Sequence, residues 1–144
     1  MKIKWLKLSA KAVIPSFAHK GDAGADICSC EDYIIAPGER KVIRTGLKVE
    51  VPQGYELQIR PRSGISLKTP LIIPNSPGTI DSGYRGEVGV IMWNTGKTPY
   101  KIKCGDRIAQ IIINRIPKVE HIEVKKLSKT KRNENGFGST GLNK

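Results

Sequence analysis

The sequence predicts an all-β fold, a β-sandwich of short antiparallel strands, and three observations lead to this prediction. Apolar and polar residues alternate with a period of two in several stretches, as they do in half-buried strands. The chain of 144 residues holds 15 glycines and 9 prolines, which indicate many turns. No amphipathic helical pattern continues for three turns. A chain of this length is expected to form one compact domain with its own core.

The alternation is clearest at 45–51 and 55–59, and Pro52 and Gly54 between these stretches are residues that a tight reversal needs. We therefore expect the two strands to form an antiparallel hairpin. The stretch 107–114 is apolar on both faces, which is typical of a strand buried from both sides, so it should be central. A helical turn or two is expected after Ser63. Further strands are expected at 2–8, 32–36, 86–94, 99–103 and 119–125.

The composition changes near residue 126, and this change divides the chain into a β domain at 1–126 and a flexible C-terminal arm at 127–144. Lysine, asparagine, serine and glycine dominate the arm, and Phe137 stands alone among small residues. Two interpretations stay open. The arm is either a frayed terminus or a glycine-hinged segment that orders over a ligand, with its N–H groups and hydroxyls on phosphate oxygens and its ring as a lid.

The net charge of +12 indicates an anionic partner. Nucleic acid, an acidic surface and a small phosphate compound all satisfy this condition, and lysines dispersed over solvated strands are the simple alternative. Both ends of the chain are rich in lysine. One interpretation of these ends is a secondary, weak binding of DNA or RNA through phosphates, and such binding should fall steeply as the salt concentration rises.

No run of roughly 18 or more apolar residues is present, and the N-terminus scatters lysines among its apolar residues. The sequence therefore predicts a soluble, unexported protein with no membrane partner. We expect it in the cytoplasm, or in the cytoplasm or nucleus of a host cell if the source is a virus. The three cysteines, Cys28, Cys30 and Cys104, lack the spacing of a zinc site, and we expect reduced thiols.

Five short clusters of polar and small residues are separated by predicted strands: AGAD at 23–26, PRSG at 61–64, PGTIDSGYRG at 77–86, GDRIAQ at 105–110 and GFGSTG at 136–141. Small residues allow close backbone approach, serine and arginine donate hydrogen bonds, and aspartates offer a base and a metal-facing charge. Together the clusters indicate a polyphosphate site. TGKTP at 95–99 resembles the end of a P-loop, but Ile91 stands where that loop needs glycine, so a turn is expected.

These five segments, in this order, resemble the five motifs of the trimeric dUTPases, and the resemblance extends from residue 23 to residue 141. It implies a distorted jelly-roll of antiparallel strands and a homotrimer with active sites between subunits. It also implies Mg²⁺-dependent hydrolysis of dUTP to dUMP and pyrophosphate, which keeps uracil out of DNA and supplies dUMP for dTMP synthesis.

The resemblance assigns roles to the third segment. Asp81 matches the aspartate that orients and deprotonates the attacking water at the α-phosphate, a typical task for a positioned carboxylate base. Tyr84 matches the tyrosine that packs on the deoxyribose and leaves no room for a 2′-hydroxyl. Asn75 matches an asparagine that lies beside the uracil. In the family, the polar edge of the uracil is recognised largely by backbone groups of the hairpin at 75–90. The hairpin residues assigned to substrate binding also include Thr79, Ile80, Val90 and Met92.

The second, fourth and first segments are assigned to the phosphates and the metal. Ser63 and Gly64 match the positions that hold the phosphates and the α–β bridging oxygen, where charge develops. Arg62 serves either the phosphates or the subunit interface. Gln110 matches a phosphate-contacting glutamine, and Asp106 and Arg107 before it are expected to support the turn. Asp26 matches an aspartate that faces Mg²⁺ through water, which suits an ion that keeps several waters.

The arm resembles the fifth motif. The resemblance places Phe137 over the uracil and Arg132 toward the γ-phosphate, and it assigns substrate contacts to Gly138, Ser139 and Thr140. Asn133 and Asn135 stand where the family usually has glycine. Asparagine tolerates positive φ better than other non-glycine residues, so the bend should survive.

Two alternatives stay open. A dCTP deaminase shares the nucleotide cradle but attacks the pyrimidine ring, and no glutamate is plainly placed for that reaction. A basic nucleic-acid-binding or regulatory protein could have kept the fold and lost the reaction. Aromatic residues make up only 6% of the chain, however, so the stacking platform that binds single strands is missing.

Overall fold

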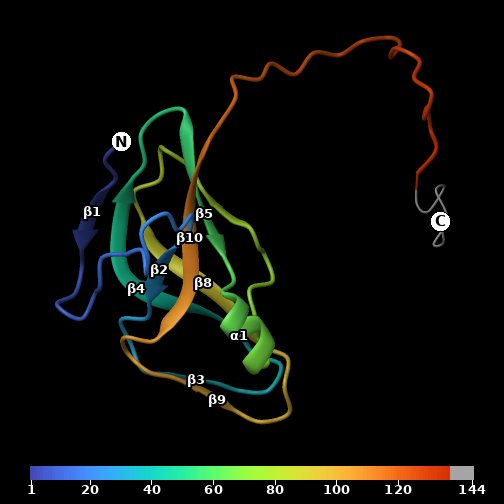
Figure 1. The fold of residues 1–144 in the computed structure, drawn as a ribbon. Coiled ribbons are helices and arrows are strands. Elements are labelled where there is room, and N and C mark those ends of the chain that lie inside the picture. Colours follow the sequence, from blue (N-terminus) through green and yellow to red (C-terminus); the bar gives the residue numbers. More distant parts are fainter. Residues whose placement is uncertain (137–144) are drawn as a thin grey trace.

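A computed structural model describes residues 1–136, and residues 137–144 lie outside the described part (Figure 1). The described residues form short antiparallel strands and one short helix, which confirms the predicted all-β class. The strands are β1 (Lys4–Lys7), β2 (Ala25–Cys28), β3 (Tyr33–Ile35), β4 (Arg40–Glu50), β5 (Tyr55–Arg60), β6 (Leu71–Ile72), β7 (Gly78–Ile80), β8 (Glu87–Asn94), β9 (Tyr100–Ile102) and β10 (Arg107–Arg115). The helix α1 (Ser63–Lys68) follows Arg62, as expected.

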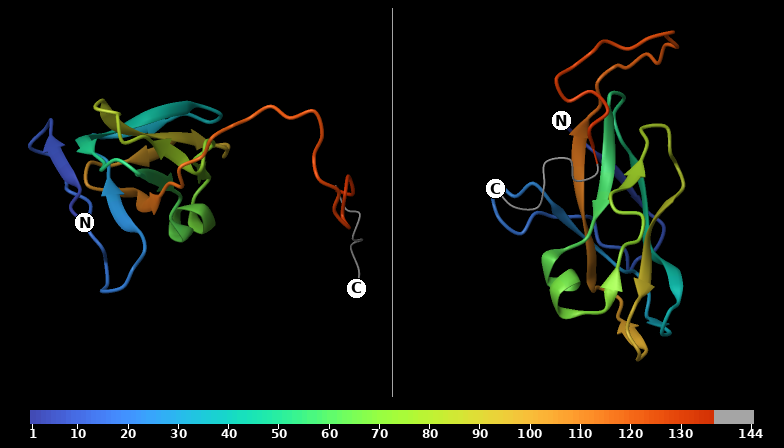
Figure 2. Two further views of the ribbon diagram at one scale, coloured as in Figure 1. Left: turned by 90° about the horizontal axis from the view of Figure 1, so that it is seen from above. Right: turned by 90° about the vertical axis from the view of Figure 1, so that its right-hand side faces the viewer.

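Two four-stranded sheets form the body of the domain, with strand orders β1-β4-β8-β6 and β2-β10-β5-β7 (Figures 1 and 2). Side chains from both sheets meet in one apolar core, which includes Ile43 and Val90 from the first sheet and Ile27, Leu57 and Ile108 from the second. A smaller pair, β3 with β9, lies at one end of the body. The molecule is therefore a sandwich, as the sequence predicts.

The expected hairpin between 45–51 and 55–59 is wrong, although both strands exist. β4 pairs with β1 and β8, whereas β5 pairs with β10 and β7. The chain reverses at Pro52 and Gly54, with Gly54 at φ +82°, and crosses from one sheet to the other. An alternating sequence fits a half-buried strand in either sheet, so the alternation predicts a strand but not the neighbouring strand with which it pairs. The prediction that 107–114 is central is confirmed, because β10 lies between β2 and β5.

The chain leaves the sheets after β10, where the Ile116 N–H still donates to the Gly54 carbonyl at 2.8 Å. Residues 117–136 form no strand or helix, so the strand expected at 119–125 is not formed among the described residues. This segment is the orange and red stretch that stands away from the body in Figure 1. Asn133 adopts φ +47°, the left-handed conformation that the sequence allowed there. The arm boundary at 126 stays a prediction. None of the described helices has the length and apolar character needed to cross a membrane.

Asn94, at the end of β8, is fully buried and connects β8 to the small sheet of β3 and β9 through hydrogen bonds. Its Nδ2 donates to the carbonyls of Ile35 and Thr98 at 3.0 and 2.8 Å, and its Oδ1 accepts from the Gly96 N–H at 3.0 Å. Each of these three backbone groups would lose a partner if the amide were removed. Asn94 is therefore a structural residue.

We predict that Asn94→Ala destabilises the fold by about 2–4 kcal/mol, because it leaves buried backbone groups unpaired and opens a small cavity. Urea unfolding of parent and variant measures this difference. Asn114→Ala on half-buried β10 is the control, since no hydrogen bond of the Asn114 side chain is present among the described residues. An Asn94 variant as stable as the control variant would contradict the prediction.

Candidate active site

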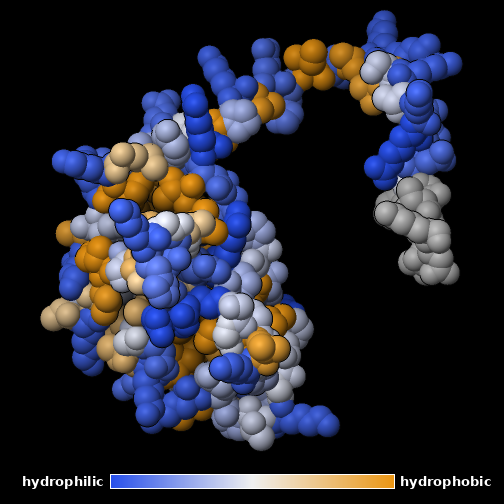
Figure 3. Space-filling model, viewed as in Figure 1, coloured by the Kyte–Doolittle hydropathy of each residue, from blue (hydrophilic) through white to orange (hydrophobic). Residues whose placement is uncertain are grey.

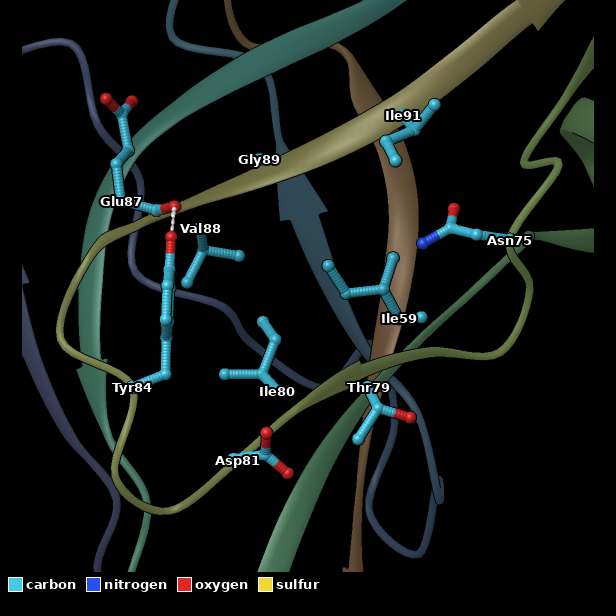
Figure 4. Close-up of a pocket in the computed structure, with 11 residues that line it drawn as sticks. Ile59, Asn75, Thr79, Ile80, Asp81, Tyr84, Glu87, Val88, Gly89 and Ile91 are labelled. Carbon is cyan, nitrogen blue, oxygen red and sulfur yellow. Dashed lines mark hydrogen bonds between the residues drawn. The ribbon is translucent and has the colours of Figure 1, made fainter.

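A first hollow, which we call the hairpin pocket, lies between β7 with its following turn and β8 (Figure 4). Its volume is ≈ 210 Å³, smaller than pockets that enclose a whole drug-sized ligand. It therefore has room for part of a larger ligand. The residues that line it include Asn75, Gly78, Ile80, Asp81, Tyr84 and Ile91.

The walls of the hairpin pocket are unpaired strand edges. β7 is the last strand of its sheet and pairs only with β5, and β8 pairs with β6 only at Trp93 and Asn94. Within the described chain, the edges of Gly78–Ile80 and of Glu87–Met92 that face each other have no strand partner. Backbone N–H and C=O groups along such edges are free to bind a ligand. The pocket can thus read a flat polar ring by fixed backbone groups.

Asn75 lies at one end of the hairpin pocket, and Asp81 and Tyr84 lie at the other (Figure 4). The side-chain nitrogen of Asn75 lies so close to Gly78 that a Cβ there would be 3.1 Å away. Asp81 is exposed at the end of β7 and begins a turn in which the Tyr84 N–H donates to the Asp81 carbonyl at 3.0 Å. This arrangement puts a carboxylate and an aromatic ring at one mouth.

The structure brings most, but not all, of the expected hairpin residues to the pocket. Thr79 and Ile80 line it together with Asn75, Asp81 and Tyr84. Val90 and Met92 are not among the residues that line it, and both are fully buried in the core. Strand alternation turns Gly89 and Ile91 toward the pocket instead. Val90 and Met92 can take part only through their backbone.

A second hollow, the sheet pocket, has a volume of ≈ 370 Å³ and holds Gly24, Asp26, Arg62, Ser63, Gly64 and Gln110. The Asp26 carboxylate is clamped by two guanidinium groups: Oδ1 lies 2.7 Å from Nε of Arg62, and Oδ2 lies 3.1 Å from Nη1 of Arg107. The sequence assigned Arg107 to the turn, so its contact with Asp26 was missed.

Ser63 and Gly64 begin α1, where the first backbone N–H groups have no partner within the helix. Gln110 donates from Nε2 to the Pro61 carbonyl at 2.9 Å. A Cβ at Gly24 would overlap the Gln110 amide, so glycine is needed for Gln110 to lie in the pocket. Cationic, hydroxyl and amide donors therefore converge on one hollow, an arrangement that suits an anion.

The sheet pocket also suits a hydrated divalent cation. Asp26 and Asp22 both line it, and within residues 1–136 no group of three or more potential ligands forms a cage. Mg²⁺ typically takes one or two protein carboxylates and completes its shell with water and phosphate oxygens. Nearby, burial raises the pKa of the Cys28 thiol, and the negative charge of Asp26 adds to this effect. Cys28 is thus a neutral thiol at neutral pH and no nucleophile.

The two pockets lie on opposite faces of the β2-β10-β5-β7 sheet. Ile59, which lines the hairpin pocket, is opposite Ile111 in the β5–β10 register, and both point into the core. Gln110 and Ile112, which line the sheet pocket, alternate with Ile111 and so point to the other face. One small ligand cannot fill both pockets of the same chain.

The arm residues form a separate group. Arg132 donates from Nε to the Asn135 carbonyl at 2.9 Å and lines neither pocket. Phe137, Gly138, Ser139 and Thr140 lie outside the described residues. Sequence reasoning also missed Glu87, whose carbonyl accepts a hydrogen bond from the Tyr84 hydroxyl at 2.9 Å. No motif in the sequence links those two residues, apart from their closeness in the chain.

Comparison with known proteins identifies relatives over nearly the whole chain. The family model described as dUTPase matches residues 10–141. A deoxyuridine 5′-triphosphate nucleotidohydrolase of Trichodesmium erythraeum is 50% identical over 141 residues, which cover 98% of this chain and 99% of that protein. The protein of the same name from Clostridioides difficile is 50% identical over 142 residues, covering 99% of this chain and 98% of the relative.

Solved structures agree with the sequence relatives. A dUTPase variant of Staphylococcus bacteriophage 80alpha, solved with dUpNHpp, superimposes with a TM-score of 0.91 at 33% identity and covers 98% of this chain and 99% of its own. A dUTPase variant from phage phi11 of S. aureus superimposes with a TM-score of 0.82 at 32% identity and covers 88% of this chain and 98% of its own. That structure describes the coordination of a structural Mg(II) ion.

Proposed function

The chain belongs to the dUTPase family, and from this membership we propose how its two pockets divide the work on dUTP. The enzyme is a dUTP nucleotidohydrolase that releases dUMP and pyrophosphate. One observation carries the proposed division of work: a pocket walled by unpaired strand edges, with a carboxylate and an aromatic ring at its mouth.

The hairpin pocket takes the uracil and the deoxyribose. Backbone groups of β7 and β8 pair with the edge of the uracil, and Asn75 closes the far end. A fixed set of backbone donors and acceptors rejects cytosine, because the wrong exocyclic group leaves buried polar atoms unpaired. The Tyr84 ring packs on the deoxyribose and blocks the space of a 2′-hydroxyl.

Asp81 is proposed as the general base. Its exposed carboxylate stands beside the sugar end of the hairpin pocket, where the α-phosphate would follow. The carboxylate accepts a proton from the attacking water, and the pyrophosphate leaves from the opposite side of the phosphorus. A positioned carboxylate base typically contributes about 10²–10⁴-fold to the rate.

The sheet pocket takes the triphosphate. Ser63, Gly64, Gln110 and Arg62 donate to phosphate oxygens, and they lie where negative charge develops as the α–β bond breaks. Asp26 would hold Mg²⁺ through water, and the bound ion would supply positive charge that neutralises the phosphates. Arg62 then exchanges its contact with Asp26 for a contact with phosphate.

We also propose a homotrimer with sites between subunits: the resemblance to the family implies the trimer, and the separation of the two pockets supports sites shared between copies. Because one chain presents them on opposite faces of a sheet, a complete site needs the hairpin pocket of one copy and the sheet pocket of another. Exposed apolar side chains support an assembled state, and Figure 3 shows orange patches along the segment that stands away from the body after β10. The exposed apolar side chains include Phe17, Val42, Val119, Ile122 and Leu127.

The arm is proposed to close over the bound nucleotide. Phe137 would cover the uracil, Arg132 would meet the γ-phosphate, and Gly138, Ser139 and Thr140 would donate hydrogen bonds. Closure excludes water and strengthens each electrostatic contact in the site. The support for this role is the resemblance of the segment to the fifth motif of the family and the extension of the family match to residue 141.

Neither alternative function is favoured. The relatives described above are called deoxyuridine 5′-triphosphate nucleotidohydrolases, a name that supports hydrolysis of dUTP rather than either alternative. Weak binding of DNA or RNA by the lysine-rich ends stays a separate prediction, which gel shifts at low and at high salt would test.

Pyrophosphate release from dUTP, dCTP, dTTP and UTP, each with and without Mg²⁺, tests the function directly. We expect rapid release from dUTP alone, and we expect it to depend on Mg²⁺. Ammonia released from dCTP would indicate a deaminase. No product from any nucleotide would indicate a binding protein that has kept the fold.

We predict that Asp81→Asn lowers kcat for dUTP by about 10²–10⁴-fold, because the amide cannot accept the proton of the attacking water. Affinity for the imido analogue dUpNHpp should change little, since the amide has nearly the shape of the carboxylate. Calorimetric titration measures that affinity, and pyrophosphate release measures kcat. A kcat close to the parent value would assign the base to another group.

We predict that two inactive variants restore each other's activity when co-expressed. Asp81→Asn disables the hairpin pocket, and Ser63→Glu puts a carboxylate where phosphate is proposed to bind. Random mixing places both intact pockets at about one quarter of the sites if each site combines two chains. Activity near one quarter of the parent value per site is expected. No recovery in mixed oligomers would mean that each site belongs to one chain.

We predict that a chain ending at Lys131 loses most of its activity while its melting temperature changes little, since residues 117–136 form no strand or helix in the described body. A chain ending at Gly141, which keeps all five motifs, is the matched control and should stay active. Thermal unfolding and pyrophosphate release provide the two measurements. A fully active Lys131 truncation would leave the arm without a role in catalysis.

A further inference from the structure

Tyr84 is held by one polar contact rather than by deep packing. Its ring is 45% exposed at the mouth of the hairpin pocket. Its hydroxyl donates to the main-chain carbonyl of Glu87 at 2.9 Å, the dashed line in Figure 4. A Cβ at Gly86 would overlap the ring, so the glycine allows the ring to fold back over its own turn. The position of the Glu87 carbonyl therefore fixes the position of the ring.

Glu87 is itself fixed from β4. Its carboxylate accepts hydrogen bonds from Arg44, whose Nη2 lies 3.1 Å from Oε2 and whose Nε lies 3.2 Å from the same atom. Its Oε1 accepts from the Gly46 N–H at 2.8 Å. The hydrogen bonds that Arg44 donates to the Glu87 carboxylate, followed by the negative charge of that carboxylate, raise the pKa of Arg44. Three donors on two β4 residues thus converge on one carboxylate.

These contacts lie where the regular ladder between β4 and β8 is interrupted. The register of the two strands shifts between Arg44 and Lys48, and Gly46 there adopts φ +67°. The Thr45 hydroxyl bonds to the Val88 carbonyl in the same place. Side chains thus replace ladder hydrogen bonds at the start of β8, which is typical of a β-bulge beside a functional site.

We propose that the Arg44–Glu87 ion pair sets the discrimination between deoxyribose and ribose, by bracing the Tyr84 ring from behind. This inference rests on the proposed function, because it assigns Tyr84 to the sugar. Arg44 and Glu87 are positioning residues that act through the Glu87 carbonyl. A braced ring cannot retreat from a 2′-hydroxyl, whereas a ring on a loosened carbonyl can give way by a fraction of an ångström.

The exposure of the pair argues against a purely structural role. The side chain of Arg44 is 58% exposed, and an ion pair with so exposed a partner contributes little to global stability. The chain offers a matched control in Lys4 and Glu50, a similar pair between β1 and β4 with a separation of 2.7 Å. Neither Lys4 nor Glu50 lines the hairpin pocket.

The experiment compares kcat/KM for dUTP with kcat/KM for UTP in the parent and in Arg44→Met, Glu87→Gln and Glu50→Gln. We expect the dUTP/UTP ratio to fall roughly tenfold or more in the first two variants, a loss in the range of a misfitted small group. Glu50→Gln should keep the parent ratio. Melting temperatures verify that all variants fold. If Glu87→Gln proves unstable, Arg44→Met still tests the inference, because Arg44 does not line the hairpin pocket.

A double-mutant comparison tests the route of the effect. Tyr84→Phe keeps the ring but removes the hydroxyl that contacts Glu87, so it should lower the ratio by itself. Adding Arg44→Met should then lower the dUTP/UTP ratio no further, because the ring no longer contacts the Glu87 carbonyl that Arg44 helps to position. A ratio unchanged by Arg44→Met, or a full additional loss in the double variant, would overturn the inference. Failure of the parent to hydrolyse dUTP would overturn the proposed function instead.

Discussion

The separation of β7 from β8 is the constraint on which the rest of the molecule depends. In a regular hairpin, these two strands would pair and satisfy each other's backbone groups. Here β7 is held by β5 in one sheet and β8 by β4 in the other, so their facing edges stay unpaired. Unpaired backbone groups near a core are unfavourable unless something binds them. The gap is thus a ready binding site for a flat polar ring, with donors and acceptors fixed by two sheets.

The same division between sheets explains why the two pockets of one chain are apart. The hairpin pocket opens on the core side of the β2-β10-β5-β7 sheet, and the sheet pocket on its outer side. A sandwich of this size cannot bring both faces of one sheet to the same ligand. The proposed assembly of copies would solve the problem without a second domain, because each copy would offer its hairpin pocket to one neighbour and its sheet pocket to another.

The sequence predicts local structure well here and pairing poorly. The alternation at 45–51 and at 55–59 identifies two strands, yet their side chains would bury equally well in a hairpin or across a sandwich. β7 has only three residues and β6 only two, too few for a period to appear. The apolar positions of 119–125 suggest a strand, but a strand also needs a partner edge, and residues 119–125 pair with no strand of the described chain.

The candidate site shows the same contrast between features that lie close in the sequence and features that depend on strand pairing. Asp81 and Tyr84 lie in one short segment, so the motif finds both. The Arg44–Glu87 contact joins residues 43 positions apart, and only the β4–β8 register brings them together. The substrate contacts assigned to Val90 and Met92 stay a prediction, and with both side chains buried in the core these contacts would be made by the backbone.

Charge links the sheet pocket to the composition of the whole chain. The excess of 25 Lys and Arg over 13 Asp and Glu attracts polyphosphate from a distance. Within the pocket, Arg62 and Arg107 neutralise the Asp26 carboxylate. A triphosphate competes with Asp26 for Arg62, since each phosphate group accepts guanidinium hydrogen bonds as a carboxylate does. In the proposed function, entry of the nucleotide would free the Asp26 carboxylate from Arg62, and the negative charges of Asp26 and the phosphates would together favour a bound cation.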